Sequence, residues 1–137
     1  MTSSARCYCG QVHLRTPAEP LIVAYCHCCD CRRWTSAPLP AFAAFDSDAV
    51  TLSRTVEERE HSEGVFRRHC PNCGSALTAR FSYLPGQTYV PLGIFDNAEA
   101  FAPSLHCHAD RALSWLHVQD DLPREIGTAQ DRLNAAT

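Results

Sequence analysis

The chain has 137 residues, the length of one domain that can bury a core of its own. Hydrophobic residues make up 45% and charged residues 20%, which excludes a disordered or collagen-like chain. The net charge is −3, and all twelve basic residues are arginines. The absence of lysine excludes a lysine Schiff base, and the acidic balance argues against a nucleic-acid surface.

Neither a membrane span nor a leader is expected. The longest apolar runs, Leu21–Cys26 and Ala37–Phe45, fall far short of the ~20 residues that a spanning helix needs. Residues 1–6 lack the apolar run of a signal peptide. We therefore expect a cytoplasmic protein with a single domain over residues 1–137, and no pattern indicates its oligomeric state.

Short apolar and β-branched runs alternate with turn signals along the chain, which predicts a mainly β fold with antiparallel pairing. The predicted strands are Gln11–Leu14, Leu21–Tyr25, Ala41–Phe45, Val50–Leu52, Val65–His69, Ala76–Phe81 and Thr88–Ile94. Helix signals are confined to one turn at Asp30–Trp34 and a short helix at Ala129–Ala136, capped by Thr128. The tail after Pro123 has few large apolar residues, so we expect it to be loosely held.

Nine cysteines in a chain without a leader favour metal or thiol chemistry over disulfides. Eight of them form three groups: Cys7 and Cys9; Cys26, Cys28, Cys29 and Cys31; and Cys70 and Cys73. The third group is a Cys-x-x-Cys-Gly zinc knuckle by spacing, and the first offers two ligands from one strand end.

Two pairs of thiolates make one closed tetrahedral zinc site, but spacing does not decide which groups combine. The central group could pair with Cys70 and Cys73, or it could bind an ion of its own. Three thiolates without a fourth protein ligand would leave an open position, which is typical of a catalytic zinc. The alternative is that all the zinc is structural.

Several motifs in order resemble the glutathione-dependent formaldehyde-activating enzyme family, which includes proteins similar to centromere protein V. They are Cys-x-Cys-Gly-x-Val from Cys7, Cys-His-Cys-x-x-Cys-Arg-Arg-Trp-Thr from Cys26, and Cys-x-x-Cys-Gly from Cys70. The likeness continues in residues 92–97, 101–103, Trp115 and 121–123, so it covers about residues 6–124 and leaves 125–137 as a tail.

The resemblance implies a β-tent stapled by two zinc ions per chain. Carried over residue by residue, the structural zinc would be held by Cys7, Cys9, Cys70 and Cys73, and the labile catalytic zinc by Cys26, Cys28 and Cys31. The activity implied is that of a carbon–sulfur lyase, in which the thiol of glutathione or another small thiol adds to formaldehyde to give an S-hydroxymethyl adduct.

Two other functions stay open: a non-catalytic zinc-stapled binding module, and a thiol redox or metal-sensing protein that uses Cys28 and Cys29. Between the central ligands, His27 is expected to make a supporting hydrogen bond rather than to act in catalysis. Arg32 and Arg33 could pair with a substrate carboxylate.

Three departures from the family pattern bear on the substrate. Ser36 follows Thr35 where many members have glycine, Cys29 adds a thiol to the central loop, and Cys107-His108 replaces an expected apolar-aromatic pair. Cys29 and Cys107 are expected to be buried small residues rather than ligands. The remaining histidines singled out are taken as structural: His61, His69, His106 and His117.

Overall fold

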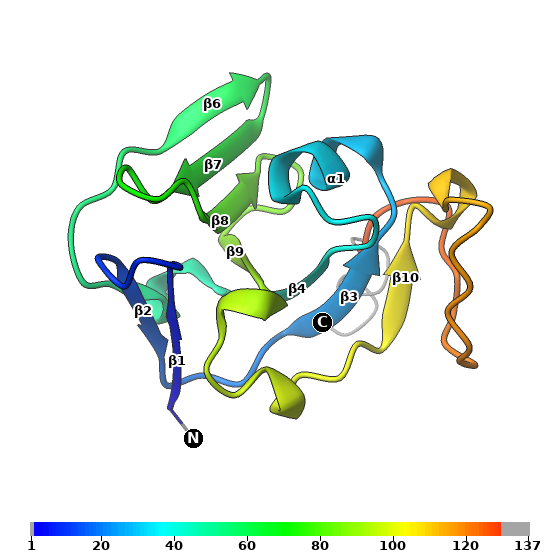
Figure 1. Cartoon of the computed structure of the whole chain (residues 1–137), viewed down its shortest axis with the longest axis horizontal. Helices are drawn as coiled ribbons and strands as arrows, with labels where there is room; N and C mark the ends of the chain where they lie inside the picture. Colours follow the sequence, from blue (N-terminus) through cyan, green and yellow to red (C-terminus); the bar gives the residue numbers. More distant parts are fainter. Residues whose placement is uncertain (1, 130–137) are drawn as a thin grey trace.

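The computed structural model describes residues 2–129, which form two sheets. The small sheet has the strand order β1-β2-β5, and the large sheet the order β10-β3-β4-β9-β8-β7-β6 (Figure 1). The strands are β1 Ser3–Arg6, β2 His13–Thr16, β3 Ile22–Cys26, β4 Ala41–Asp46, β5 Thr51–Leu52, β6 Arg59–Ser62, β7 Val65–His69, β8 Ala76–Phe81, β9 Gln87–Pro91 and β10 Leu105–Cys107. The mainly β fold predicted from the sequence is confirmed.

Helical structure is sparse, as expected. The α-helix α1 spans Cys29–Thr35, and four short 3-10 turns lie at Ser47–Ala49, Leu92–Ile94, Ala98–Ala100 and Ala109–Arg111. None of the helices in the described part of the chain has the length and apolar character to cross a membrane. The helix predicted at Ala129–Ala136 falls almost wholly outside the described residues.

Strand β4 lies inside the large sheet, and both of its faces are buried. Ala43 and Phe45 belong to the core between the two sheets, together with Val12 and Leu14 from the small sheet. Successive side chains of a strand point to opposite faces, so Phe42 and Ala44 face the other side. There they pack with Cys31, Leu84 and Tyr89 in a second cluster under α1.

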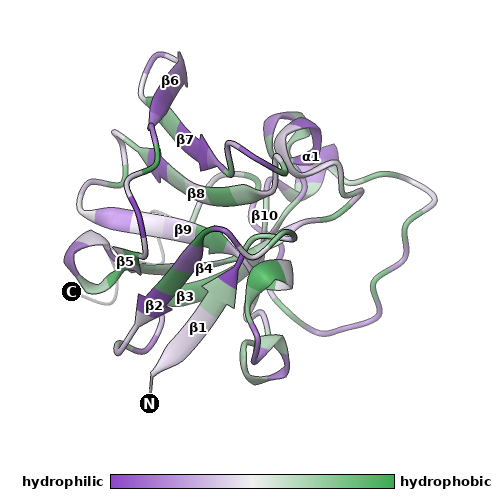
Figure 2. Ribbon diagram, turned by 60° about the vertical axis from the view of Figure 1, so that its left-hand side comes forward, coloured by the Kyte–Doolittle hydropathy of each residue, from purple (hydrophilic) through white to green (hydrophobic). Residues whose placement is uncertain are grey.

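Polarity rises toward the far edge of the large sheet. Every residue of β6 is exposed, and the colours of Figure 2 mark β6 and much of β7 as hydrophilic and β3 and β4 as mainly hydrophobic. The polar sequence of β6 explains why it escaped prediction, because an exposed edge strand needs no apolar alternation. Strands β1 and β10 were missed as well, since each is short and neither holds more than one large apolar residue.

Two predictions from the sequence are wrong. One concerns where strand β9 ends, and the other concerns how firmly the segment after Pro123 is held. The strand predicted over Thr88–Ile94 ends at Pro91, which lacks an N–H for the ladder, and a 3-10 turn follows. The segment after Pro123 is not loosely held up to Gly127. Backbone hydrogen bonds tie it to β10 and the turn after it, including His106 N to Pro123 O at 2.9 Å and Glu125 N to His106 O at 2.8 Å. Main-chain pairing substitutes for the missing apolar side chains.

One pairing differs from the antiparallel rule and places the central cysteines. β10 runs parallel to β3, with Cys107 opposite Cys26. The backbone N–H of His27 then donates to the carbonyl of Cys107 at 3.0 Å. Residues that follow β10 therefore lie beside the residues that follow β3.

Candidate metal centres and their cavity

The first cluster unites two cysteine pairs that are 61 residues or more apart in the chain. The sulfurs of Cys7, Cys9, Cys70 and Cys73 all lie within 4.8 Å of one another. Cys7 Sγ is 3.6 Å from Cys9 Sγ, and Cys9 Sγ is 3.8 Å from Cys70 Sγ. Sulfurs bound at about 2.3 Å to a tetrahedral zinc are roughly 3.8 Å apart, so this donor set fits the ion.

Each pair is shaped by a tight turn that ends in glycine. Gly10 and Gly74 have φ angles of +83° and +80°, a conformation that glycine adopts without strain. The turns aim backbone N–H groups at the sulfurs, as from Val12 to Cys7 Sγ at 3.3 Å and from Cys73 to Cys70 Sγ at 3.4 Å. Such donors stabilise thiolates, the form that binds metal.

Ser75 links the two turns of this first cluster. Its hydroxyl accepts from the backbone N–H of Tyr8 at 2.9 Å and lies 3.1 Å from Cys73 Sγ. The hydrogen bond from Ser75 lowers the pKa of the Cys73 thiol to about 5. Sequence reasoning did not single out Ser75, although its position directly after Cys-Gly was a usable signal.

The second cluster lies where β3 passes into α1. Cys26 Sγ is 3.4 Å from Cys28 Sγ, and Cys28 caps the helix by accepting from the backbone N–H of Cys31 at 3.3 Å. Cys31 is buried and lines the same cavity as Cys26 and Cys28. Of the three thiols expected together from the sequence, the structure brings the sulfurs of Cys26 and Cys28 into contact, and Cys31 is not in the group of ligand atoms that lie within 4.8 Å of one another.

These three thiols hold different charges. Hydrogen bonds from Cys26 and then Cys31 lower the pKa of Cys28 to about 2, so it is the thiolate of the group. The hydrogen bond to Cys28 raises the pKa of Cys26 well above its ordinary value, with burial adding to the effect. Contact with Cys26 acts to lower the pKa of Cys31, but the Cys28 thiolate and burial raise it to about 12. A cation is needed before all three can ionise together.

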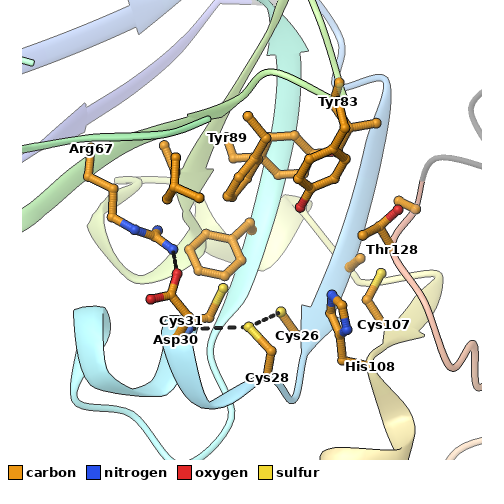
Figure 3. A pocket seen from close by; sticks show the side chains of 17 residues that line it. Cys26, Cys28, Asp30, Cys31, Arg67, Tyr83, Tyr89, Cys107, His108 and Thr128 are labelled. Atoms are coloured by element: carbon orange, nitrogen blue, oxygen red, sulfur yellow. Dashed lines mark hydrogen bonds and ion pairs between the residues drawn. The ribbon is translucent and has the colours of Figure 1, made fainter. Parts of the chain in front are cut away.

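A fourth donor stands beside this cluster, and the sequence analysis had not counted it. A ring nitrogen of His108 and the sulfurs of Cys26 and Cys28 all lie within 4.8 Å of one another (Figure 3). The signal for it was its place in the chain, because Cys107-His108 departs from the expected apolar-aromatic pair. Cys107 itself is buried, as expected, whereas Cys29 is exposed, contrary to expectation. Cys29 begins α1 on its solvent side.

The second cluster opens on a cavity of about 290 Å³ that the first cluster does not touch. Aromatic and aliphatic side chains line most of it, among them Phe42, Phe81, Tyr83, Leu84 and Tyr89. Figure 3 shows the hydroxyl of Tyr83 pointing toward the cysteines. Burial, with the nearby cysteines, raises the pKa of Tyr83 to about 12, so this hydroxyl keeps its proton at neutral pH.

Arg67 is the cation of this cavity. Its side chain is 3% exposed and its guanidinium stacks 4.3 Å from the ring of Trp34. Nη2 donates to Asp30, while Nη1 is buried without a hydrogen-bond partner among the residues described. Arg32 and Arg33, the expected carboxylate partners, are not among the residues that line the cavity. The helix turns them elsewhere.

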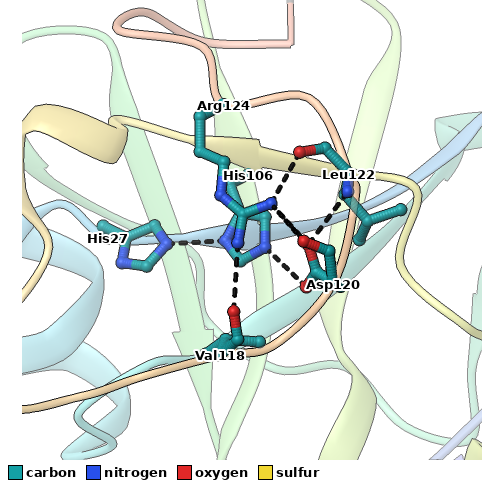
Figure 4. A network of polar contacts seen from close by, with 6 residues as sticks. All are labelled: His27, His106, Val118, Asp120, Leu122 and Arg124. Carbon is teal, nitrogen blue, oxygen red and sulfur yellow. Dashed lines mark hydrogen bonds and ion pairs between the residues drawn. The ribbon is translucent and has the colours of Figure 1, made fainter.

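His27 is not among the residues that line the cavity and belongs instead to a chain of polar contacts (Figure 4). Its Nε2 is 2.8 Å from Nδ1 of His106, whose Nε2 is 3.0 Å from the carboxylate of Asp120. The hydrogen bond from His106 lowers the pKa of Asp120 to about 2. A carboxylate there requires His106 to donate from Nε2, so His106 accepts from His27 at Nδ1. The contact anchors the loop that carries Cys26 and Cys28.

The fold and these clusters define a small β protein with one four-cysteine group and one cysteine–histidine group at a cavity. The chain belongs to the glutathione-dependent formaldehyde-activating enzyme family, whose model matches residues 2–111. An uncharacterized lyase of Schizosaccharomyces pombe is 33% identical over 81 residues, which cover 59% of this chain and 58% of the relative.

A solved structure shares the fold. The crystal structure of a Rhodobacter sphaeroides protein superposes with a TM-score of 0.54 and 18% identity. The superposition covers 88% of this chain and 98% of that chain. The arrangement of sheets is therefore one that an experimentally determined protein also adopts.

Proposed function

We propose that this protein is a zinc-dependent lyase that forms or cleaves an S-hydroxymethyl or similar adduct of a small thiol, with glutathione as the leading candidate. The family description and the lyase name of the S. pombe relative support a lyase-type reaction. The observation that carries the proposal is the contrast between the clusters, because the second one lines the largely apolar cavity of about 290 Å³ and the first does not.

The two clusters would then have separate roles. Cys7, Cys9, Cys70 and Cys73 would hold a structural zinc that joins the small sheet's first turn to the β7–β8 connection. Cys26, Cys28 and Cys31 would hold the catalytic zinc. When bound there, the ion supplies Lewis acidity, which lowers the pKa of a thiol and polarises a carbonyl group.

The reaction itself is an addition without oxidation or reduction. The S–H bond of the thiol and the C=O π bond of the aldehyde break, a carbon–sulfur bond forms, and the proton ends on the former carbonyl oxygen. Tyr83 can donate a hydrogen bond to that oxygen, because its hydroxyl faces the cysteines and stays protonated.

Arg67 would hold the acidic end of the thiol compound. Nη1 is an unused donor at the cavity, and burial strengthens its attraction for a carboxylate. Glutathione carries two carboxylates, so one of them could reach this group. A thiol without a carboxylate would lack this contact and should bind more weakly.

The direct test is to mix the purified, zinc-loaded protein with glutathione and formaldehyde and to follow the adduct by NMR exchange spectroscopy. The account predicts exchange between free and adduct forms faster than in buffer. Removal of the labile metal should return the rate to the uncatalysed value. Unchanged exchange with glutathione and with other small thiols would refute the proposed reaction.

A redox function is the second candidate, and one contact favours it. Cys28 is held as a thiolate 3.4 Å from Cys26 Sγ, close enough for a disulfide after a small movement. This function requires a central cluster free of metal. Mass spectrometry after mild oxidation, with and without zinc, distinguishes the two, because bound zinc should protect both thiols.

A further inference from the structure

We propose that the imidazole of His108 is the fourth protein ligand of the central zinc, so that the resting site is Cys26, Cys28, Cys31 and His108 rather than an open three-cysteine site. This inference rests on the zinc site of the proposed function and changes its resting state. It starts from three donor atoms, a His108 ring nitrogen and the sulfurs of Cys26 and Cys28, that all lie within 4.8 Å of one another. Cys31 lines the same cavity but lies outside this group, so its sulfur would move toward the ion when the site is filled.

The sheet register brings His108 to this position. Because β10 pairs in parallel with β3 and Cys107 lies opposite Cys26, both chains leave the sheet at the same level. One continues into Cys28 and α1, and the other into His108. Neutral imidazole and thiolates together are a common donor set for zinc.

The backbone of His108 is held in an unusual conformation. Its φ of 51° and ψ of 44° are left-handed, which only Ser36 shares among the non-glycine residues described. The N–H of His108 donates to Gly127 O at 3.0 Å, and its carbonyl accepts from Arg111 N at 3.0 Å. Non-glycine residues in this region are strained and concentrate at functional sites. Here the strain turns the ring toward the cavity and the two sulfurs.

A fourth protein ligand changes what the site does at rest. Three thiolates, one neutral imidazole and Zn²⁺ carry a net charge of −1 and leave no vacant position in a tetrahedral site. A substrate thiol must then compete with His108. The imidazole would keep the ion bound between turnovers and make its position available to a stronger, anionic sulfur donor.

Cobalt spectroscopy tests this without an activity assay. A mild chelator first removes the central ion from the protein with zinc retained in the first cluster, and Co²⁺ is then added. The visible bands of tetrahedral cobalt report whether a nitrogen is bound. In H108G, where glycine accepts the left-handed backbone, the bands should shift and the affinity for the central ion should fall about tenfold or more. Added imidazole should restore both, and H61A, an exposed control, should match the wild type.

The outcomes separate this inference from the proposed function. Cobalt bands unchanged in H108G would overturn the role of His108 and leave the three-cysteine site intact. A wild-type protein that binds no central ion would overturn both. If added imidazole restores the spectrum of H108G but the protein does not catalyse thiol–aldehyde exchange, His108 is a ligand and the proposed reaction is wrong.

Discussion

His27 Nε2 lies 2.8 Å from His106 Nδ1, and this contact fastens the cysteine loop to the neighbouring strand. His27 stands between two of the proposed ligands, and His106 is completely buried in β10. Strand β10 contains none of the three cysteines proposed as ligands. Through His106 it nevertheless helps to position Cys26 and Cys28. Contacts that orient ligands are worth about 10- to 100-fold in metal affinity.

We therefore expect the central ion to leave H106A about 10- to 100-fold faster than it leaves the wild type, because His106 no longer holds the cysteine loop. The measurement is the rate of zinc transfer to a chromogenic chelator. L105A is the matched control, since Leu105 is equally buried in β10 but has no hydrogen bond to His27. Equal zinc loss from both variants would contradict the role assigned to the histidine pair.

C28S should remove the central zinc and leave the fold intact, because Cys28 is not in the first cluster and a serine can also cap α1. Circular dichroism and metal content after gel filtration check this. C29S is a closely matched control: Cys29 is the next residue, is exposed, and should be dispensable for metal. An unfolded C28S protein would show that the two clusters do not divide structural and catalytic roles.

Arg67 and Asp30 should affect substrate binding in opposite directions. R67M removes the cavity cation and should raise KM for glutathione about tenfold, with little change in kcat, as expected for about 1.4 kcal/mol. D30N leaves Arg67 without its acidic partner, so KM should fall. Steady-state kinetics measure both, with a thiol lacking carboxylates as the reference. A rise in KM for both variants would mean that the pair only supports α1.

Glu58 joins two strands of the large sheet and should make stability depend on pH. Hydrogen bonds from Arg80, with the charge of Arg68, hold the pKa of Glu58 below its ordinary value of 4.5. A carboxyl with a lower pKa in the folded state stabilises the protein above the unfolded pKa, and this contribution is lost as the pH falls through the folded value. E58Q should therefore cost roughly 1 kcal/mol of unfolding free energy at pH 7.

In acid the difference between E58Q and the wild type should vanish, because Glu58 is then protonated in both states. Urea unfolding at matched pH measures it, and comparing the two proteins cancels the acid-induced loss of metal. E57Q is the control, since Glu57 is exposed and lies 3.6 Å from Arg59 in a surface ion pair. A constant E58Q deficit at all pH values would contradict the linkage.

The local patterns of the chain were enough for its central strands and its cysteine groups. Runs such as Ala41–Phe45 and Ala76–Phe81 are apolar because they are buried, and the observed strands match them within one residue. The helix predicted at Asp30–Trp34 forms as α1, one residue longer at each end. Cysteine spacing identified the three cysteine groups, since each is encoded within a few residues, but only the family resemblance indicated which groups share an ion.

Features that depend on pairing between distant segments of the chain could not be predicted from the sequence. The parallel register of β10 with β3 cannot be deduced from three residues, and it is what brings His108 to the central cysteines. The cavity is likewise assembled from several strands, so neither Tyr83 nor Arg67 stood out in the sequence. The cytoplasmic location and the single domain over residues 1–137 stay predictions.

The most direct test of two separate zinc sites is the number of zinc ions per chain, measured by native mass spectrometry before and after a mild chelator. The account predicts two ions, one removed readily while the folded charge-state distribution is kept. A single tightly held ion, with the central thiols free to react with an alkylating reagent, would contradict it.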